Sequence, residues 1–172
     1  PLPAGTAEIQ FVNKWVADKG DLLLRRGMYI HLQRNLLLPM LLTFDQPDSI
    51  VTCTRRERSN TPLQALLLAN DRSFFEFAQG LASEITRADI SQDEERLTYA
   101  FRRSLSRLPS EQELTRLMDF FESRREYFKS TPGDAEKVAP ANRADGFPLE
   151  EAAAWTAVSR VLFNLDEFIT RE

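Results

Sequence analysis

The chain is poor in the residues that build disulfides and most transition-metal sites. It has one Cys and one His among 172 residues. A disulfide within the chain is therefore excluded, and so is a zinc site built from several Cys and His ligands. The C-x-x-C-H motif that attaches haem covalently is also absent. We expect no metal and no cofactor in this chain.

Long apolar runs and a strong positive charge are missing too. No segment approaches the ~20 consecutive apolar residues of a membrane helix, so we expect no membrane span. The net charge is −4 and the pI is about 5.2. Nucleic acid is therefore not expected as a partner, because such binding depends on basic surfaces that displace counterions from phosphates. What is present, 42% hydrophobic and 28% charged residues, is typical of a globular domain.

The length predicts one domain. A chain of 172 residues lies below the ~250 residues at which chains split into domains, so we predict a single domain over residues 1–172. The chain begins Pro1-Leu2-Pro3, without a Met and without a signal peptide. We therefore expect it to be a piece of a longer protein, and its first residues carry no information about compartment.

Basic residues gather in the first part of the chain. Residues 1–72 hold nine Lys and Arg against seven Asp and Glu, whereas residues 73–172 hold thirteen against nineteen. Of the 22 basic residues, 18 are Arg, which pairs bidentately with carboxylate, phosphate or sulfate oxygens. A GC-rich genome is the alternative explanation of this bias.

From Thr61 onward the apolar pattern has a helical period. We predict helical hairpins over residues 61–130, because apolar residues recur three and four positions apart between capping motifs. The two helices around Pro109 are expected to be antiparallel neighbours. The expected helix starts are Asn60-Thr61-Pro62, Asp71 (or Ser73 with Glu76), Ser91 to Glu94, and Ser110 to Glu113.

The last forty or so residues predict a loop and a buried helix. Residues 131–148 hold three Pro and two Gly without an apolar period, which favours an exposed loop. The segment from Leu149 to Leu165 is apolar nearly all round. A helix with no polar face belongs in the core, so we predict a buried C-terminal helix within residues 149–172.

The first sixty residues predict an irregular arm with short elements. Ile9–Val16 suits a short helix or a strand, and Gly27–Leu32 is apolar and short enough for a buried strand. Leu36–Phe44 suits a short helix that ends in a turn at Asp45–Asp48. The predicted fold class is therefore mainly α, a single-domain helical bundle whose irregular N-terminal region has room for a short strand or two.

The densest polar segment runs from Thr52 directly into the helix that starts at Pro62. Arginines, hydroxyls and free helical N–H groups meet there, and helix N-termini bind phosphate, sulfate or carboxylate. Arg25 and Arg34 can add to the site. The alternative is that the arginines form structural salt bridges with acidic groups such as Asp45, Asp48 and Glu57. The candidate ligand-binding residues are Arg26, Arg55, Arg56, Arg58, Asn60, Thr61 and Gln64.

No catalytic constellation emerges from the sequence. His31 with Asp45 can serve as a general base, but no nucleophile motif accompanies it, and a lone His in an apolar run is typical of a core or surface position. Cys53 lies beside arginines, which would favour a reactive thiol; the alternative is an inert half-buried Cys. Trp15 and Tyr29 can line a sugar or partner surface. We predict no catalytic residue and no metal ligand.

Motifs of this sequence, among them those within Arg25–Tyr29, Cys53–Leu66 and Trp155–Val158, resemble the C-terminal conserved domain of large planctomycete-type secreted proteins. The resemblance covers the chain from about Arg25 to its end, except the predicted loop. It is specific because the run Arg-Arg-x-Arg-x-Asn-Thr-Pro-Leu-Gln-Ala-Leu is long and unusual. Two departures are Arg72, where many relatives have Pro, and Ile30–Leu32, which replaces a more aromatic stretch. The matching segments are Arg25–Tyr29, Thr43–Asp48, Cys53–Leu66, Asn70-Asp71, Phe101–Arg103, Arg107–Pro109, Trp155–Val158 and Asn164–Glu172.

The resemblance implies a domain of unknown function in a larger protein. Its relatives usually follow another uncharacterised domain and often a cytochrome c-like domain, so haem is expected outside this chain. The implied location is extracytoplasmic, either periplasmic or at the cell surface, and genes nearby often encode sulfatases and polysaccharide-degrading enzymes. The resemblance carries no catalytic residue over to this chain.

Three functions remain open at this point. The first is a non-catalytic C-terminal structural or interaction module that packs against neighbouring domains of a cytochrome-associated polypeptide. The second is a site for a sulfated or acidic saccharide on the Arg-rich segment before Pro62. The third is a share in a multidomain redox or hydrolytic enzyme.

Overall fold

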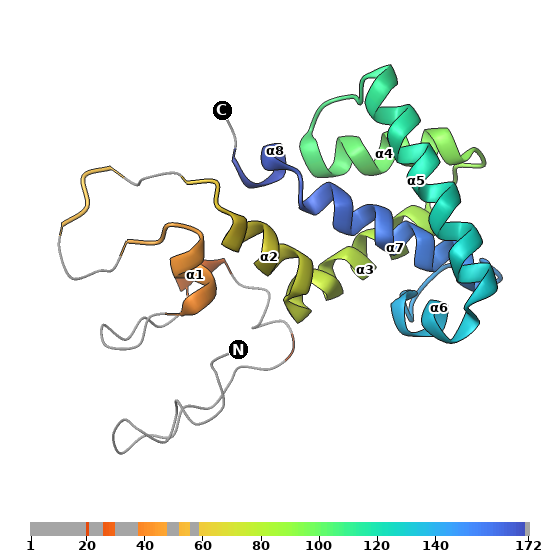
Figure 1. Ribbon diagram of the computed structural model, residues 1–172, viewed down its shortest axis with the longest axis horizontal. Coiled ribbons are helices and arrows are strands. Elements are labelled where there is room, and N and C mark those ends of the chain that lie inside the picture. Colours follow the sequence, from red (N-terminus) through yellow and green to blue (C-terminus); the bar gives the residue numbers. More distant parts are fainter. Residues whose placement is uncertain (1–19, 21–25, 30–37, 48–51, 56–58, 171–172) are drawn as a thin grey trace, which may run out of the picture. The chain divides into compact units, whose positions relative to one another are not determined.

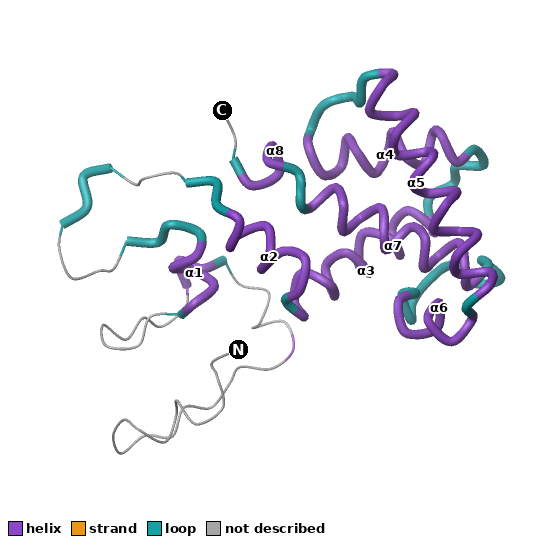
Figure 2. The backbone as a smooth tube through the Cα atoms, viewed as in Figure 1, coloured by secondary structure: helices purple, strands orange, loops and turns teal. Residues whose placement is uncertain are grey.

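A computed structural model describes residues 20, 26–29, 38–47, 52–55 and 59–170. The chain divides into two compact units, Pro1–Ser59 and Asn60–Glu172, and each is described by itself. The helices of the described residues are separated only by turns and loops, with no strand among them (Figure 2). The mainly α fold class is therefore confirmed. The division coincides with the predicted end of the irregular arm, and the expectation of one domain stays a prediction.

In the first unit the predicted strand at Gly27–Leu32 is wrong where the structure describes it. Gly27–Tyr29 forms a 3₁₀ turn, η2, in which the Tyr29 N–H donates to the Arg26 carbonyl over 2.9 Å. Met28 and Tyr29 are 71% and 64% exposed, so the segment lacks the burial that a core strand requires. The rest of that segment and the element predicted at Ile9–Val16 lie outside the described residues.

The short helix predicted before Asp45 is present as α1 (Pro39–Thr43), with Pro39 at its first position. Phe44 caps its end, and Asp45 then adopts a left-handed conformation with φ of 58°. Asp tolerates this region better than most residues because its short side chain bonds locally. The turn that ends the helix is formed by residues 44 and 45, one residue earlier than the start of the predicted turn at Asp45–Asp48, and Asp48 lies outside the described residues.

The second unit consists of helices joined by short connections (Figure 1). Two of the expected caps are reciprocal capping boxes, Thr61 with Gln64 and Ser110 with Glu113, and Asp71 accepts the Ser73 N–H over 2.7 Å. The helices are α2 (Pro62–Asn70), α3 (Arg72–Arg87), α4 (Asp93–Leu105), α5 (Glu111–Ser130), α6 (Pro132–Val138), α7 (Leu149–Phe163) and α8 (Asp166–Ile169).

The capping box predicted at Ser91 is wrong. Gln92 is the N-cap of α4 and no side chain bonds to the helix start. Asp93, Glu94 and Glu95 instead fill the first turn, where acidic side chains interact favourably with the positive end of the helix dipole. The same helix ends at Leu105 rather than at Pro109, because Ser106 takes a left-handed conformation with φ of 62°.

Helix α7 lies at the centre of the second unit, as its all-round apolar pattern predicts. It packs against α3, α5 and α6 (Figure 1). Trp155 is fully buried and its ring lies 4.2 Å from that of Phe121 on α5. Ala152, Ala153 and Ala154 are also fully buried, and their small side chains allow neighbouring helices to approach α7 closely.

Two predicted boundaries near the C-terminus need correction. The exposed loop predicted at 131–148 contains α6, whose Ala135 is only 1% exposed and packs in the core. In this seven-residue helix only Ala135 and Val138 pack against the core, which is too few apolar positions for a visible period. The C-terminal helix ends at Phe163, and the separate short helix α8 follows Asn164.

No helix among the residues that the structure describes is both long enough and apolar enough to cross a membrane.

The two serines predicted as caps provide a matched test of the fold. Ser110→Ala should lower the free energy of unfolding by about 1 kcal/mol, because it removes a side-chain bond to the Glu113 N–H. Ser91→Ala should change it by less than about 0.5 kcal/mol, the usual range for a surface substitution. Urea unfolding of both variants checks this. Equal losses would show that the Ser110 bond does not stabilise α5.

Candidate functional site

The residues of the predicted anion site are distributed over both units. Arg26 and Arg55 are exposed and belong to the first unit, whereas Asn60, Thr61 and Gln64 belong to the second. Arg56 and Arg58 lie outside the described residues, as do Arg25, Arg34 and His31. A ligand site on these arginines therefore stays a prediction.

The start of α2 offers an anion fewer donors than the sequence suggests. Pro62 has no N–H, and the N–H groups of Gln64 and Ala65 both donate to Thr61. The side chain of Gln64 accepts the Thr61 N–H over 3.1 Å and the residue is 1% exposed. Gln64 and Thr61 therefore stabilise the helix start, and the inference of several free N–H groups there is wrong.

Asp45 has a structural role within the first unit. Its carboxylate accepts hydrogen bonds from the Ser59 N–H over 2.7 Å and from the Ser59 hydroxyl over 2.8 Å. These bonds join two residues of the first unit that lie fourteen positions apart in the sequence. Cys53 is exposed and its thiol donates to the Arg55 carbonyl over 3.1 Å. Among the described residues, no cluster of His, Cys, Asp and Glu can hold a metal ion.

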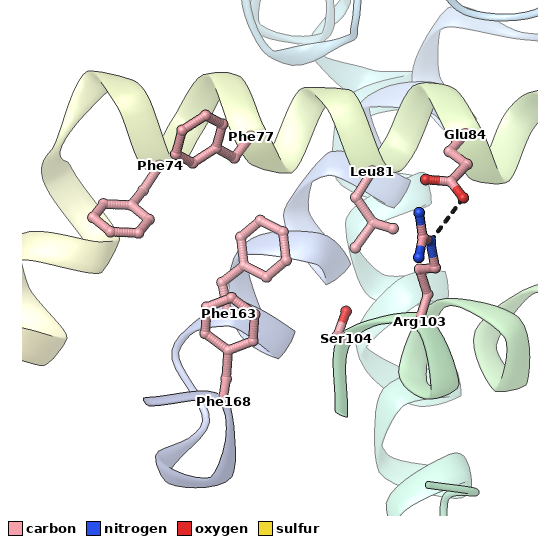
Figure 3. Close-up of a pocket in the computed structure, with 8 residues that line it drawn as sticks. All are labelled: Phe74, Phe77, Leu81, Glu84, Arg103, Ser104, Phe163 and Phe168. Atoms are coloured by element: carbon pink, nitrogen blue, oxygen red, sulfur yellow. Dashed lines mark hydrogen bonds and ion pairs between the residues drawn. The ribbon is translucent and has the colours of Figure 1, made fainter. Parts of the chain in front are cut away.

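The second unit contains an aromatic groove that the sequence analysis missed (Figure 3). We use this name for a depression of about 360 Å³ walled by Phe74 and Phe77 of α3, Phe163 of α7 and Phe168 of α8, with Leu81 at its base. Phe74 and Phe77 meet edge to face at 6.0 Å, and Phe163 and Phe168 stack at 4.7 Å. Phe77 is 44% exposed. Apolar surface of this kind is available to a partner.

One end of the aromatic groove is polar. There the Arg103 Nε donates to Glu84 over 2.9 Å (Figure 3). The Tyr99 hydroxyl donates to the same carboxylate oxygen over 2.7 Å. The Tyr99 bond, followed by Arg103, holds the pKa of Glu84 below its ordinary value, and the bond to Glu84 raises the pKa of Tyr99. Glu84 is therefore charged at neutral pH and paired. This end of the groove is close to neutral overall.

Arg107 holds α8, and with it Phe168, against the rest of the unit. Its guanidinium donates to Glu113 at the start of α5 and to Glu167 on α8, each at distances down to 2.7 Å. It also lies 4.8 Å over the ring of Phe101. These bonds lower the pKa of Glu113 to about 2 and lower that of Glu167, and they raise the pKa of Arg107. We call Arg107, Glu113 and Glu167 the Arg107 clamp.

The chemistry of the aromatic groove suits binding. Its titratable residues are a carboxylate and a guanidinium already bonded to each other, and Ser104 donates to the Ala100 carbonyl within its own helix. No nucleophile and base face one another among its lining residues. Phe74 and Phe77 belong to the apolar residues that recur three and four positions apart in the predicted helices. Such spacing alone does not distinguish an aromatic residue of the core from one that lines a surface groove.

Comparison with known proteins identifies a family match. The model of the family described as "PSD1: Protein of unknown function (DUF1553)" matches residues 4–121, which is more than half of the chain. Neither the curated proteins nor the solved structures contain a match.

The Arg107 clamp makes stability depend on pH in the acid range. Both carboxyls have pKa values below the ordinary 4.5 in the folded chain, and that of Glu113 is about 2. Their contribution to the free energy of unfolding is complete above the pKa that they have in the unfolded chain. It is lost as the pH falls through their pKa in the folded chain. The free energy of unfolding should therefore fall between about pH 4.5 and pH 2, and less steeply in Arg107→Gln. Urea unfolding from pH 2 to pH 7 measures this.

Arg102→Gln is the control for this measurement. Arg102 is an exposed neighbour on α4 without an ion pair among the described residues. In Arg102→Gln the free energy of unfolding should fall with pH as steeply as in the parent chain. If the free energy of unfolding fell equally steeply with pH in Arg107→Gln and in the parent chain, the Arg107 clamp would not be the cause of the pH dependence.

Proposed function

We propose that this chain, which belongs to the PSD1 family of proteins of unknown function, is a non-catalytic interaction module of a larger protein. In this proposal the aromatic groove binds an apolar segment of a neighbouring domain of the same polypeptide. The extracytoplasmic setting and the cytochrome-type neighbour are part of the proposal and rest on the motif resemblance. The observation that carries it is the groove of four phenylalanines open to the surface.

The groove has the size and composition of a docking site. Its volume of about 360 Å³ lies within the range of ~300–1,000 Å³ typical of ligand pockets, and its walls are mostly aromatic. Covering the exposed part of such side chains releases water and stabilises a complex by about 25 cal/mol per Å². Rings that already stack, as those of Phe163 and Phe168 do, lose little conformational freedom on binding.

The polar end of the groove indicates what kind of segment fits. Arg103 and Glu84 neutralise each other, so a strongly charged partner gains little there. The terminal nitrogens of Arg103 and the second oxygen of Glu84 have no partner among the described residues. A neutral group that both donates and accepts, such as a peptide amide, matches this pair. We therefore favour a peptide segment with apolar side chains as the occupant.

A third feature supports a binding role over a catalytic one. Every described group with a shifted pKa belongs either to the pair around Glu84 or to the Arg107 clamp. Both sets are explained by ion pairs and hydrogen bonds that join helices. Their pKa shifts move the groups away from neutral pH, whereas a general acid or base works best with a pKa near it.

The proposal is tested with overlapping peptides, here called tiles, that together cover the neighbouring domains of the proposed larger polypeptide. Fluorescence polarisation should find at least one apolar tile that binds the full 172-residue chain. Phe77→Ser should weaken that binding about tenfold, because covering a half-exposed Phe contributes on the order of 1–2 kcal/mol. Its exposure of 44% keeps the cost to folding small.

Leu108→Ser is the matched control. Leu108 is an apolar residue with 63% exposure that does not line the groove, so its loss should leave binding unchanged. If no tile binds, or if both variants lose affinity equally, the groove is not the docking site.

A further inference from the structure

Glu84 also lines a second depression, whose lining has more polar residues than that of the aromatic groove. It has a volume of about 490 Å³. Its walls come from three segments: α3, Tyr99 of α4, and Asn142 in the connection between α6 and α7. We call it the Gly80 pocket, after one of the residues of α3 that line it.

Gly80 has no packing reason to be glycine. It lies inside the sixteen-residue helix α3, where glycine costs about 1 kcal/mol relative to alanine. A Cβ added at Gly80 meets no atom within 4 Å, and its φ is not in the left-handed region. Glycine at such a position leaves room for something to approach the backbone closely.

The rim of the Gly80 pocket is held in place before any ligand arrives. Ser83 donates to the Asn142 carbonyl over 2.8 Å, and the Ala144 N–H donates to the hydroxyl of Thr86 over 3.3 Å. Gln79 donates to the carbonyls of Val138 and Ala139. One face of α3 thus fixes the connection after α6. A pre-arranged rim lowers the entropy cost of binding.

A second stripe of α3 supplies the polar groups of the pocket. Gly80, Glu84 and Arg87 are spaced four and three residues apart, which puts them on one face of the helix. Glu84 bonds to Tyr99 and Arg103 through one oxygen, Oε1. Arg87 is exposed and has no ion pair among the described residues, and the Asn142 amide has no partner among them either.

These groups define the chemistry of a ligand. Because Arg103 already neutralises Glu84, the positive charge of Arg87 is uncompensated and favours an anion. Arginine binds carboxylates with two parallel hydrogen bonds. The second oxygen of Glu84 only accepts hydrogen bonds, and the Asn142 amide does both. Hydroxyl groups satisfy both residues.

We propose that the Gly80 pocket binds a small hydroxylated carboxylic acid, with its carboxylate on Arg87 and its hydroxyls on Glu84 and Asn142. The pocket shares Glu84 with the peptide-binding groove of the proposed function, but Arg87 and Asn142 line this pocket and do not line the groove. The volume is ample for a monocarboxylic sugar acid, and the open space over Gly80 admits its ring.

Calorimetric titration of the full chain tests the proposal at fixed ionic strength. The probes are D-glucuronate, D-glucose, which lacks the carboxylate, and butyrate, which lacks the hydroxyls. Glucuronate should bind with a millimolar or lower Kd, and each of the other two at least tenfold more weakly. No saturation by glucuronate at 20 mM, or equal affinity for glucose, would overturn the proposal.

Two pairs of variants locate the site. Gly80→Ala should raise the Tm by about 2–4 °C through helix propensity and still abolish glucuronate binding, a combination that a folding defect cannot produce. Gly133→Ala, at another glycine with open space around it, should keep binding. Arg87→Gln should weaken binding at least tenfold, whereas Arg102→Gln should not. Binding that survives in both Gly80→Ala and Arg87→Gln would place the ligand elsewhere.

Discussion

The burial of α7 is the constraint on which the second unit depends. The ring of Trp155 packs at a tilt against that of Phe121 in the core, and the alanines before it allow α3, α5 and α6 to pack around one helix. The buried hydroxyls of Thr156 and Ser159 donate to carbonyls one turn earlier in α7, so both of these hydroxyls are satisfied within the helix. Both surface depressions lie on α3, and its position is set by this packing.

The two depressions share one carboxylate but differ in chemistry. Glu84 lines both of them, and its bonds to Tyr99 and Arg103 tie α3 to α4. On one side, four phenylalanines present apolar surface, and on the other a glycine exposes helix backbone beside polar groups. The Arg107 clamp adds a further constraint, since it holds α8 and therefore the wall of the aromatic groove that Phe168 forms.

Helix positions were largely predictable because capping and apolar periodicity are local signals. Thr61, Asp71 and Ser110 each cap the helix that the sequence assigns to them. Ser91 did not, because the acidic first turn of α4 stabilises a start without a side-chain cap. The short helix α6 escaped prediction for the opposite reason, since its stability comes from packing of Ala135 against the core and its Pro and Gly are typical of loops.

The sequence by itself determined the helical class, most of the helix starts, the central place of α7, and the exclusion of a disulfide within the chain. Only the tertiary structure decided which phenylalanines are core and which form a groove, because helices far apart in sequence must meet before a surface exists. The same holds for the open space beside Gly80 and for the pairing of Arg107 with Glu167, sixty residues away. Spacing along the chain specifies contacts within a helix, whereas packing between helices decides the sites.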